Sequence, residues 1–357
     1  MLKKTFLSVS LLAGYVFSFA QDSTKAAATP PPVTITGSVD VYYRANLSAP
    51  TGANNNYTSF TNSNNSFELG MASLRADHSF GKASATVDLG FGRRAEEFAY
   101  ANTSYPSLFA VKQAFVSYAI SDNFKLTMGK WGTHIGYEVL DAYLNRNYSM
   151  DYMFSYGPFS HTGIKADIGL GGVSTLMLGI ANPTDNVTTT SGTKYIIGQF
   201  GTGSKNGKVK AYLNYQGANW GSGGSVNQLD LVVTATVTDK FSLGYNGTDY
   251  MFKPKGGSSE SWWGSALYLN VDPTTNFGMT LRGEYFSDKD GIIGSGTPTF
   301  MDGSVFDATL SFICKVGNLA IIPELRLDNG SKEIFTKSDG TASKSTFTAL
   351  LAATYHF

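Results

Sequence analysis

The last strand of this chain restricts its fold more than any other feature. From Phe347 to Phe357 apolar and polar side chains alternate: Phe347, Ala349, Leu351, Ala353, Tyr355 and Phe357 share one face, and Thr348, Thr354 and His356 share the other. Because successive side chains of a strand point to opposite faces, one face of this strand suits lipid and the other suits water. A terminal strand of this kind, ending in an aromatic residue, predicts a β-barrel in an outer membrane.

The first twenty residues have the features of a signal peptide. Two lysines precede an apolar run from Phe6 to Phe19, and Ala20 is the small residue expected at a cleavage site. The run is too short to cross a membrane as a helix. We therefore expect a cleaved signal peptide over residues 1–20, a Pro-rich periplasmic lead-in over residues 21–32 and a barrel domain over residues 33–357.

Composition excludes two other classes of protein. Charged residues make up 15% of the chain, against about 25% in ordinary soluble domains. After residue 20 no segment approaches the roughly 18 apolar residues of a membrane-spanning helix, which excludes a helical inner-membrane protein. The net charge is zero, and nucleic-acid binding would require a basic surface. We expect no cofactor.

Short turns and long polar loops alternate along the chain. We assign the short turns to residues 81–82, 121–123, 169–172, 204–207, 238–240, 272–276 and 315–318. We assign the long loops to residues 47–65, 99–109, 132–155, 184–193, 219–225, 253–260, 289–302 and 329–343. This order predicts an all-β, antiparallel, up-and-down transmembrane barrel of about sixteen strands, with fourteen and eighteen left open. Both termini then lie at the short-turn end, in the periplasm.

A soluble β-sandwich is the structural alternative, since its half-buried strands also alternate. Residues 83–91 and 229–237 show the alternation clearly. A sandwich would carry charged outer faces, whereas the polar faces here hold few charges and the loops carry the hydrophilic residues. The terminal Phe357 and the even spacing of the turns also favour a barrel.

The most distinctive stretch lies between residues 124 and 165. It contains a strand ending in Gly129-Lys130-Trp131, then Gly136-Tyr137-Glu138, then Asn147-Tyr148-Ser149, then Pro158-Phe159-Ser160-His161-Thr162-Gly163. This order of motifs resembles the OmpL-like β-barrel porin family. The resemblance implies a passive channel with no named substrate. Because sixteen-stranded porins are commonly trimers, it also favours a homotrimer.

The third long loop belongs to this stretch, and in sixteen-stranded porins that loop folds inward and narrows the pore. We expect Glu138 and Asp141 to place carboxylates at the constriction. Basic wall residues would face them: Arg44, Arg94, Lys210, Arg282 and Arg326. A transverse field of this kind selects among solutes by charge and dipole. Two alternatives stay open: the two acids are solvated loop charges, or the inward charges pair with each other.

The function predicted from these features is passive diffusion of small hydrophilic solutes and ions through an outer-membrane porin. One alternative is a substrate-specific channel, for example for sugars, with an aromatic track of Trp131, Tyr137, Tyr143, Trp262 and Trp263. Another is a surface adhesin or structural barrel with a plugged lumen. We do not expect an enzyme, because the four histidines form no His-Glu-x-x-His motif.

The expected partners follow from the same interpretation. A barrel with an apolar outer face contacts outer-membrane lipid and lipopolysaccharide. Tyr355 and Phe357 are the candidate terminal signal for the barrel-assembly machinery. Small hydrophilic solutes and further copies of the chain complete the set, and nucleic acid is not among them.

Overall fold

The computed structural model describes residues 30–51, 55–102, 106–221, 223–293 and 303–357. The predicted signal peptide and most of the predicted lead-in lie outside these residues. Contacts divide the chain into residues 1–31 and residues 32–357, and the description below concerns the second unit. No helix in the described part of the chain is long and apolar enough to cross a membrane.

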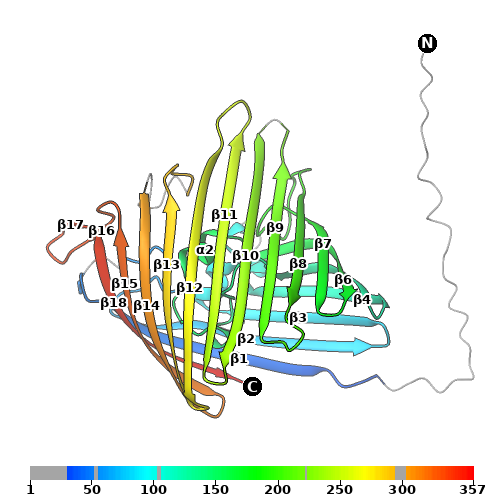
Figure 1. Cartoon of the computed structure of the whole chain (residues 1–357), viewed down its shortest axis with the longest axis horizontal. Helices are drawn as coiled ribbons and strands as arrows, with labels where there is room; N and C mark the ends of the chain where they lie inside the picture. Colours follow the sequence, from blue (N-terminus) through cyan, green and yellow to red (C-terminus); the bar gives the residue numbers. More distant parts are fainter. Residues whose placement is uncertain (1–29, 52–54, 103–105, 222, 294–302) are drawn as a thin grey trace, which may run out of the picture. The chain divides into compact units, whose positions relative to one another are not determined.

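Sixteen strands of the described residues close into one antiparallel barrel (Figure 1), as predicted. The first eight are β1 (Thr34–Asn46), β2 (Ser66–Phe80), β3 (Ala83–Phe91), β4 (Val111–Ser121), β5 (Phe124–Gly132), β6 (Ser160–Gly171), β7 (Ser174–Ala181) and β8 (Tyr195–Gly203). The others are β9 (Val209–Asn219), β10 (Gly224–Thr238), β11 (Phe241–Pro254), β12 (Glu260–Thr274), β13 (Phe277–Asp288), β14 (Gly303–Val316), β15 (Leu319–Gly330) and β18 (Ser345–His356). A separate pair, β16 (Phe335–Thr336) and β17 (Ala342–Ser343), forms a small hairpin before β18.

The last strand closes the barrel against the first. β18 pairs with β1 from Ser38↔His356 to Asn46↔Thr348. Beyond this ladder, the backbone N–H groups of Gly37 and Phe357 each donate to the other residue's carbonyl at 3.0 Å. Closure matters because lipid offers no partners for the backbone groups of an open sheet edge.

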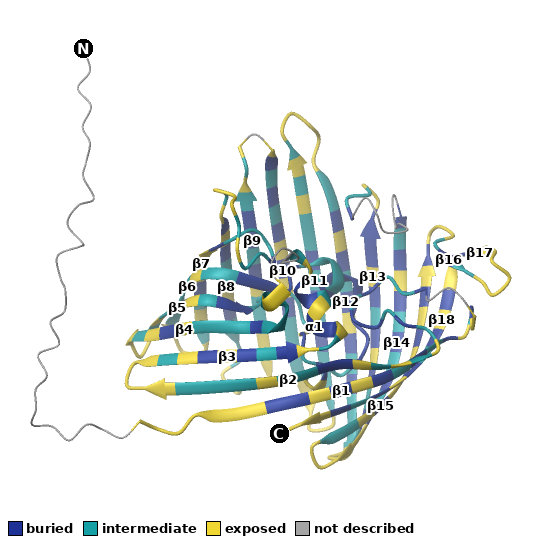
Figure 2. Cartoon of the chain, turned by 180° about the vertical axis from the view of Figure 1, so that it is seen from behind, coloured by how far each residue is buried: buried dark blue, intermediate teal, exposed yellow. Residues whose placement is uncertain are grey.

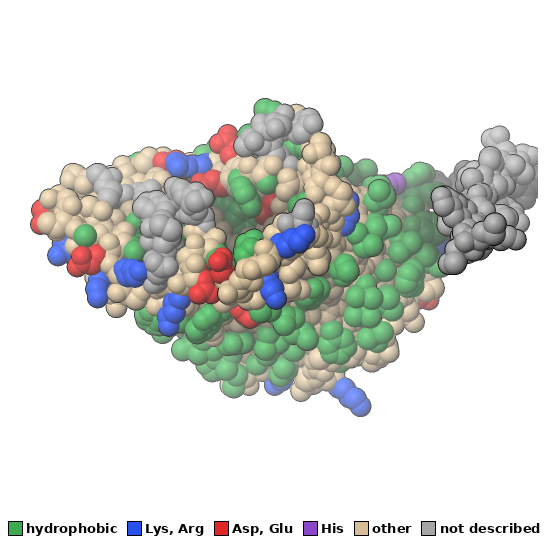
Figure 3. All heavy atoms as spheres, turned by 90° about the horizontal axis from the view of Figure 1, so that it is seen from above, with side chains coloured by type: hydrophobic (Ala, Val, Ile, Leu, Met, Phe, Trp, Pro, Cys, Tyr) green, Lys and Arg blue, Asp and Glu red, His purple; other side chains and the backbone are tan. Residues whose placement is uncertain are grey.

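Side chains alternate between lipid and lumen along the strands, and Figure 2 shows the resulting stripes. In β18, Leu351 and Tyr355 are exposed, whereas Thr348 and Thr354 are buried inside. Phe67 of β2 is 87% exposed on the outer wall. Seen from the loop end, hydrophobic side chains cover the outer wall below the polar loops (Figure 3). The outer face therefore suits lipid, as the alternation predicted.

Long loops and short turns occupy opposite ends of the barrel. The long loops, named L1 to L8 in chain order, cover residues 47–65, 92–110, 133–159, 182–194, 220–223, 255–259, 289–302 and 331–344. Most of L7 lies outside the described residues. β1 begins and β18 ends at the short-turn end. The predicted boundaries hold to within a few residues, except at L2 and the end of L3.

L2 begins earlier than predicted, because β3 ends at Phe91. Gly92, with a φ of 113°, breaks the strand. L2 then forms α1 (Arg93–Phe98) and the 3₁₀ turns η1 (Tyr100–Asn102) and η2 (Pro106–Ala110). The prediction that Arg94 belongs to the barrel wall is therefore wrong, since Arg94 lies on α1 inside the lumen.

L3 contains η3 (Ala142–Leu144) and α2 (Tyr152–Tyr156) and lies inside the barrel. Much of the hydrophobic core is also found there. One cluster of buried residues joins L1, L2, L3 and β2, namely Phe60, Met71, Ala95, Phe98, Leu140, Met150, Phe154 and Phe159. The inward loops thus form part of a packed core.

Candidate functional site: a lumen divided by the third loop

L3 crosses the barrel interior and contacts several walls. The backbone N–H of Gly136 donates to Asp230 of β10 at 3.0 Å, and that of Tyr137 donates to Asn246 of β11 at 3.2 Å. Further along, the N–H of Tyr148 donates to Glu324 of β15 at 2.7 Å. Side chains of the wall therefore satisfy backbone groups that an irregular loop cannot pair with itself.

Four charged wall residues form what we call the L3 anchor: Arg282, Glu284, Glu324 and Arg326. Glu324 accepts the N–H groups of Tyr148 (2.7 Å) and Ser149 (3.2 Å), and Glu284 accepts those of Tyr152 (2.7 Å) and Met153 (2.9 Å). Arg282 donates to the Ser149 carbonyl at 2.8 Å, and Arg326 donates to the Met150 carbonyl at 2.7 Å. Charge-assisted bonds of this kind are among the strongest in proteins.

Two wall glycines let L3 approach closely. A Cβ atom on Gly244 would lie 2.6 Å from the ring of Tyr137, and one on Gly264 would lie 2.4 Å from Cγ of Met153. A side chain at either position would displace the loop. The wall and L3 therefore fit each other along β11 and β12 as well as at the L3 anchor.

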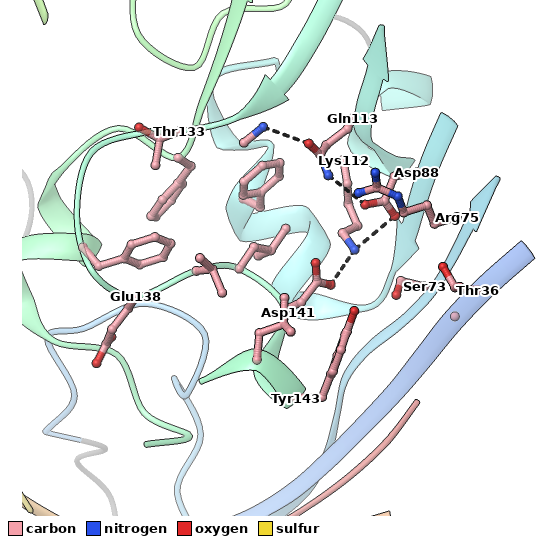
Figure 4. Close-up of a pocket in the computed structure, with 18 residues that line it drawn as sticks. Thr36, Ser73, Arg75, Asp88, Lys112, Gln113, Thr133, Glu138, Asp141 and Tyr143 are labelled. Carbon is pink, nitrogen blue, oxygen red and sulfur yellow. Dashed lines mark hydrogen bonds and ion pairs between the residues drawn. The ribbon is translucent and has the colours of Figure 1, made fainter. Parts of the chain in front are cut away.

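Glu138 belongs to this structural contact. Its carboxylate lies 2.7 Å from Arg282 and accepts the Asp151 N–H at 2.8 Å. The side chain is buried; burial together with the nearby Asp151 raises the pKa of Glu138, and Arg282 opposes this shift. Figure 4 shows its carboxylate turned away from the cavity that contains Asp141. The predicted pairing of inward charges is thus present between Glu138 and Arg282.

The other predicted basic residues are also mostly committed to partners. Arg326 pairs with Asp328 at 2.8 Å. Arg44 donates to the Ser63 carbonyl of L1 at 2.8 Å. Lys210 is exposed near the short-turn end of β9, away from L3. These side chains do not face Glu138 and Asp141 as a single ring.

Arg94 is fully buried among L1, L2 and L3. It lies 3.6 Å from Asp40 of β1, and its guanidinium stacks 4.9 Å from the ring centroids of both Phe60 and Tyr148. A guanidinium placed over aromatic faces is held by the negative charge of those faces. Arg94 therefore joins three inward loops to β1.

An inner cavity of about 290 Å³ lies on the short-turn side of L3 (Figure 4). Asp141 projects into it and lies 2.5 Å from Lys112, which is also 3.1 Å from Asp88. Gln113 donates to Asp88 at 3.1 Å, and Arg75 lines the same space. The inner cavity therefore holds charges of both signs in a narrow volume.

The predictions missed Arg75 and Lys112, because irregular registers reverse the alternation. The pairing of β2 with β1 shifts so that Gly70 has no partner, after which Arg75 points inward. In β4, Leu89 pairs with Val111 and Asp88 pairs with Gln113, which leaves Lys112 as the extra residue of a bulge. A β-bulge redirects side chains in this way, and simple alternation gives no signal for it.

An outer cavity of about 760 Å³ opens among the loops, and Figure 3 shows a hollow with hydrophobic side chains on that face. Its aromatic and amide lining consists of Tyr100, Tyr156, Phe159, Tyr195, Tyr250, Trp262, Asn62, Gln216 and Gln228. Glu97 is the one charged residue in its described lining. That carboxylate lies 3.4 Å from Arg93 and accepts the Phe60 N–H at 2.7 Å. The outer cavity thus offers no unpaired charge from these residues.

Three phenylalanines separate the cavities, and we call Phe98, Phe154 and Phe159 the phenylalanine septum. Phe159 lines both cavities, and its ring centroid lies 5.9 Å from that of Phe98 and 5.4 Å from that of Phe154. Asp185 of L4 holds this end of L3 by accepting the Phe159 N–H at 2.8 Å. Burial raises the pKa of Asp185 to about 6.

A family comparison decides the class of this barrel. The model of the family described as "Putative beta-barrel porin-2, OmpL-like" matches residues 32–357. The chain belongs to this family. It is an outer-membrane porin, as its motifs in residues 124–165 and its closed barrel indicated.

Solved structures share the fold of this porin. The outer membrane channel DcaP of Acinetobacter baumannii is 14% identical, with a TM-score of 0.61 over 93% of this chain and 99% of that chain. The anion-selective porin from Comamonas acidovorans is 13% identical, with a TM-score of 0.57 over 91% and 99%. A trimer form of OmpT of Vibrio cholerae is 11% identical, with a TM-score of 0.56 over 91% and 99%. The comparison with curated proteins gives no significant match.

The aromatic residues predicted for a sugar track occupy separate places in the porin. Trp262 lines the outer cavity, Tyr143 lines the inner cavity, and Trp131 packs into a wall cluster with Tyr195. Tyr137 stacks on Tyr268 at 4.1 Å. Trp263 is 44% exposed on the outer wall, so its assignment to a track through the lumen is wrong. In the described residues no group of His, Cys, Asp and Glu is arranged as a metal site.

Proposed function

We propose that this porin passes small hydrophilic solutes and ions by diffusion from the outer cavity, past the phenylalanine septum, into the inner cavity. One observation supports this route above all. Phe159 lines both cavities, so the ring shared by the two spaces belongs to the phenylalanine septum, between a space open at the loops and a space on the short-turn side of L3. Movement of this ring is the step that we propose opens the route.

Charge selection takes place in the inner cavity. Lys112 lies 2.5 Å from Asp141 and 3.1 Å from Asp88, and Arg75 lines the same cavity. Charges that line a narrow pore set its ion preference. Asp141 is the exposed member of the pair with Lys112, with 18% of its side chain accessible against 3%. Its carboxylate is therefore the member of this pair that a passing ion can approach.

Glu138 has a different part in this proposal. Its carboxylate is bound to Arg282 and to the backbone of L3, so it holds the loop in place. Arg282 also pairs with Asp307 at 2.7 Å, so neutralising Glu138 weakens the hold on L3 without leaving Arg282 unpaired. The two acids predicted for the constriction should therefore respond differently to neutralisation.

Single-channel recordings of the refolded porin in a planar bilayer test both roles. A salt gradient gives the ratio of cation to anion permeability. We expect Asp141→Asn to lower that ratio roughly twofold, because it removes a pore charge. Glu138→Gln should leave the ratio unchanged and make the current unstable.

A folded parent without any current would contradict the diffusion proposal. It would favour the surface adhesin or structural barrel with a plugged lumen. An Asp141→Asn variant with the ion preference of the parent would instead remove only the assignment of charge selection to the inner cavity.

The remaining partners and the lack of catalysis are also proposals. The trimer form of OmpT supports further copies of this chain as partners, which mass measurement in detergent would test. Tyr355 and Phe357 are exposed at the closing strand, where the assembly machinery and lipid could reach them. Crosslinking during refolding would test those contacts.

A family of channels supports a non-enzymatic role, which assays with lipid and ester substrates would check.

A further inference from the structure

The outer cavity has the chemistry of a binding site for an uncharged solute. Its volume of about 760 Å³ falls within the range of roughly 300–1,000 Å³ found for small-molecule sites. Glu97, the charged residue in its described lining, is already paired with Arg93 and bonded to Phe60. An ion entering this space would lose water without gaining a free opposite charge from these residues.

Aromatic rings form one side of this cavity. Tyr250 and Trp262 are directly paired across β11 and β12, with parallel rings 5.4 Å apart and 7° between their planes. Trp262 in turn packs against Phe286 of β13 at 5.3 Å. The row thus rests on three adjacent strands, which hold it rigidly. Tyr250 at the end of the row is half-buried and lines the cavity.

Amide side chains form a second, polar side. Gln216 of β9 donates to Gln228 of β10 at 2.8 Å, and Gln228 donates to Thr248 of β11 at 3.2 Å. Both glutamines border the cavity but are buried, and Gln216 accepts from the hydroxyl of Thr184 at 3.4 Å. Thr184 and Asn62 are the half-buried polar residues of this lining that a ligand can reach. An amide has donors and acceptors together, and these bonds fix how it points. Such groups match hydroxyls, which also donate and accept.

We propose that the outer cavity binds a neutral saccharide, with the sugar ring against Tyr250 and its hydroxyls toward Asn62 and Thr184. A sugar combines a face of C–H groups with a rim of hydroxyls. The C–H face is attracted to the negative face of an aromatic ring, and the rim suits the amide of Asn62 and the hydroxyl of Thr184. This inference rests on the proposed function, since it names the class of solute that enters the channel first.

Block of the ion current by maltose tests the proposal. Maltose is added at rising concentration to the parent porin in a planar bilayer, beside sodium glucuronate as a charged sugar. We expect maltose to reduce the current at lower concentration than glucuronate does. Tyr250→Leu should raise the half-blocking concentration roughly five- to tenfold, because the ring contact is lost. Tyr250→Phe keeps the ring and should behave as the parent.

A matched control lies on the same strand. Tyr245 alternates with the buried Gly244 and Asn246 and so faces outward, and Tyr245→Leu should leave maltose block unchanged. Tyr100 lines the cavity with 55% of its surface exposed. Tyr100→Leu provides a second cavity variant and should weaken block in the same direction. Urea unfolding checks its fold, because Tyr100 also donates to Asp185 at 3.1 Å.

An open channel that maltose does not block would overturn the proposal, as would equal block in the parent and in both cavity variants. A parent that conducts no ions would contradict the proposed function instead. In that case calorimetric titration of maltose, in a detergent without a sugar headgroup, decides the inference. Binding that Tyr250→Leu weakens would support it, and no binding would overturn it.

Discussion

The outer and inner cavities share Phe159 but differ in their chemistry. The outer cavity is lined by tyrosines, a tryptophan and amides, and Glu97 is the charge in its described lining. The inner cavity has less than half that volume, 290 against 760 Å³, and is lined by Arg75, Asp88, Lys112 and Asp141. On the proposed route, a solute entering from the loops would meet a lining in which Glu97 is already paired, and the charges of the inner cavity afterwards.

This difference in lining shows how one barrel can select solutes by shape and hydroxyl groups in one space and by charge in another. L3 divides the lumen, so the loop-end halves of β8 to β12 line one space and the wall of β1 to β5 lines the other. Recognition of shape and hydroxyls can then be tuned apart from recognition of charge. The division depends on the phenylalanine septum and on the L3 anchor, so substitutions in these two groups of residues test it.

Removing the septum should have the largest effect. Phe159→Ala deletes the ring that lines both cavities, and we expect the conductance to rise at least roughly twofold, since the narrowest point dominates a pore. The buried ring contributes to stability, so unfolding should become easier by about 3–5 kcal/mol. Single-channel recording measures the first effect and urea unfolding the second.

The control for this variant is Phe306→Ala on the outer wall, where the ring is 47% exposed. It removes the same atoms without touching the lumen and should leave the conductance unaltered. If Phe159→Ala conducts as the parent does, the solute path does not pass the phenylalanine septum and the two cavities are separate pockets.

Weakening the L3 anchor should have a smaller effect on mean conductance and a larger one on its steadiness. Glu284→Gln keeps the shape of a side chain that accepts the N–H groups of Tyr152 and Met153 but removes its charge. Charge-assisted hydrogen bonds exceed neutral ones by about 1 kcal/mol each. We expect flickering between current levels as L3 leaves the wall.

Glu260→Gln, at the loop end of β12, is the matched control for this variant and should give a steady current. Limited proteolysis provides an independent reading, since a released L3 is cut more readily. Steady current and unchanged proteolysis in Glu284→Gln would mean that the remaining contacts of L3 suffice.

The sequence predicted the barrel because its signals are local and repeated. Alternation such as that of residues 229–237, the short turns and the terminal Phe357 each report a strand that must face lipid and water. Counting the short turns gives sixteen strands, and it places the start of the first strand and the end of the last strand at the short-turn end. None of this needed knowledge of which strands contact L3.

The predicted site was less accurate, because its charges depend on packing at long range. Arg282 and Glu138 are 144 residues apart in sequence and meet only when L3 folds in. Lys112 faces inward because of a bulge in β4. Arg94 lies on α1 and not in the barrel wall, because β3 ends before Gly92. Alternation assigns a face to a residue, but it gives neither its partner nor a local shift of register.

The smallest expected effect is a loss of stability at acid pH, which tests the contacts of His134 at the start of L3. His134, the second residue of L3, donates from Nε2 to the Tyr215 carbonyl at 3.2 Å and packs 4.9 Å from the ring of His161. Burial, with Lys165 nearby, lowers the pKa of His134 to about 4. In the unfolded chain His134 binds a proton as the pH falls below about 6.5, whereas in the folded chain it stays neutral until the pH approaches about 4.

The contribution of His134 to stability is therefore full above about pH 6.5 and is lost as the pH falls toward about 4. One pKa unit corresponds to about 1.4 kcal/mol, so the contribution of His134 should fall by an amount on the order of 2 kcal/mol between pH 7 and pH 4.5. Asp185 and Glu138, with raised pKa values, act in the opposite direction, so the effect is the difference between the parent and His134→Asn. Urea unfolding at the two pH values measures it. His134→Asn should flatten this dependence, whereas His78→Asn on the outer wall should keep it. Equal pH dependence in the parent and in His134→Asn would contradict this assignment to His134.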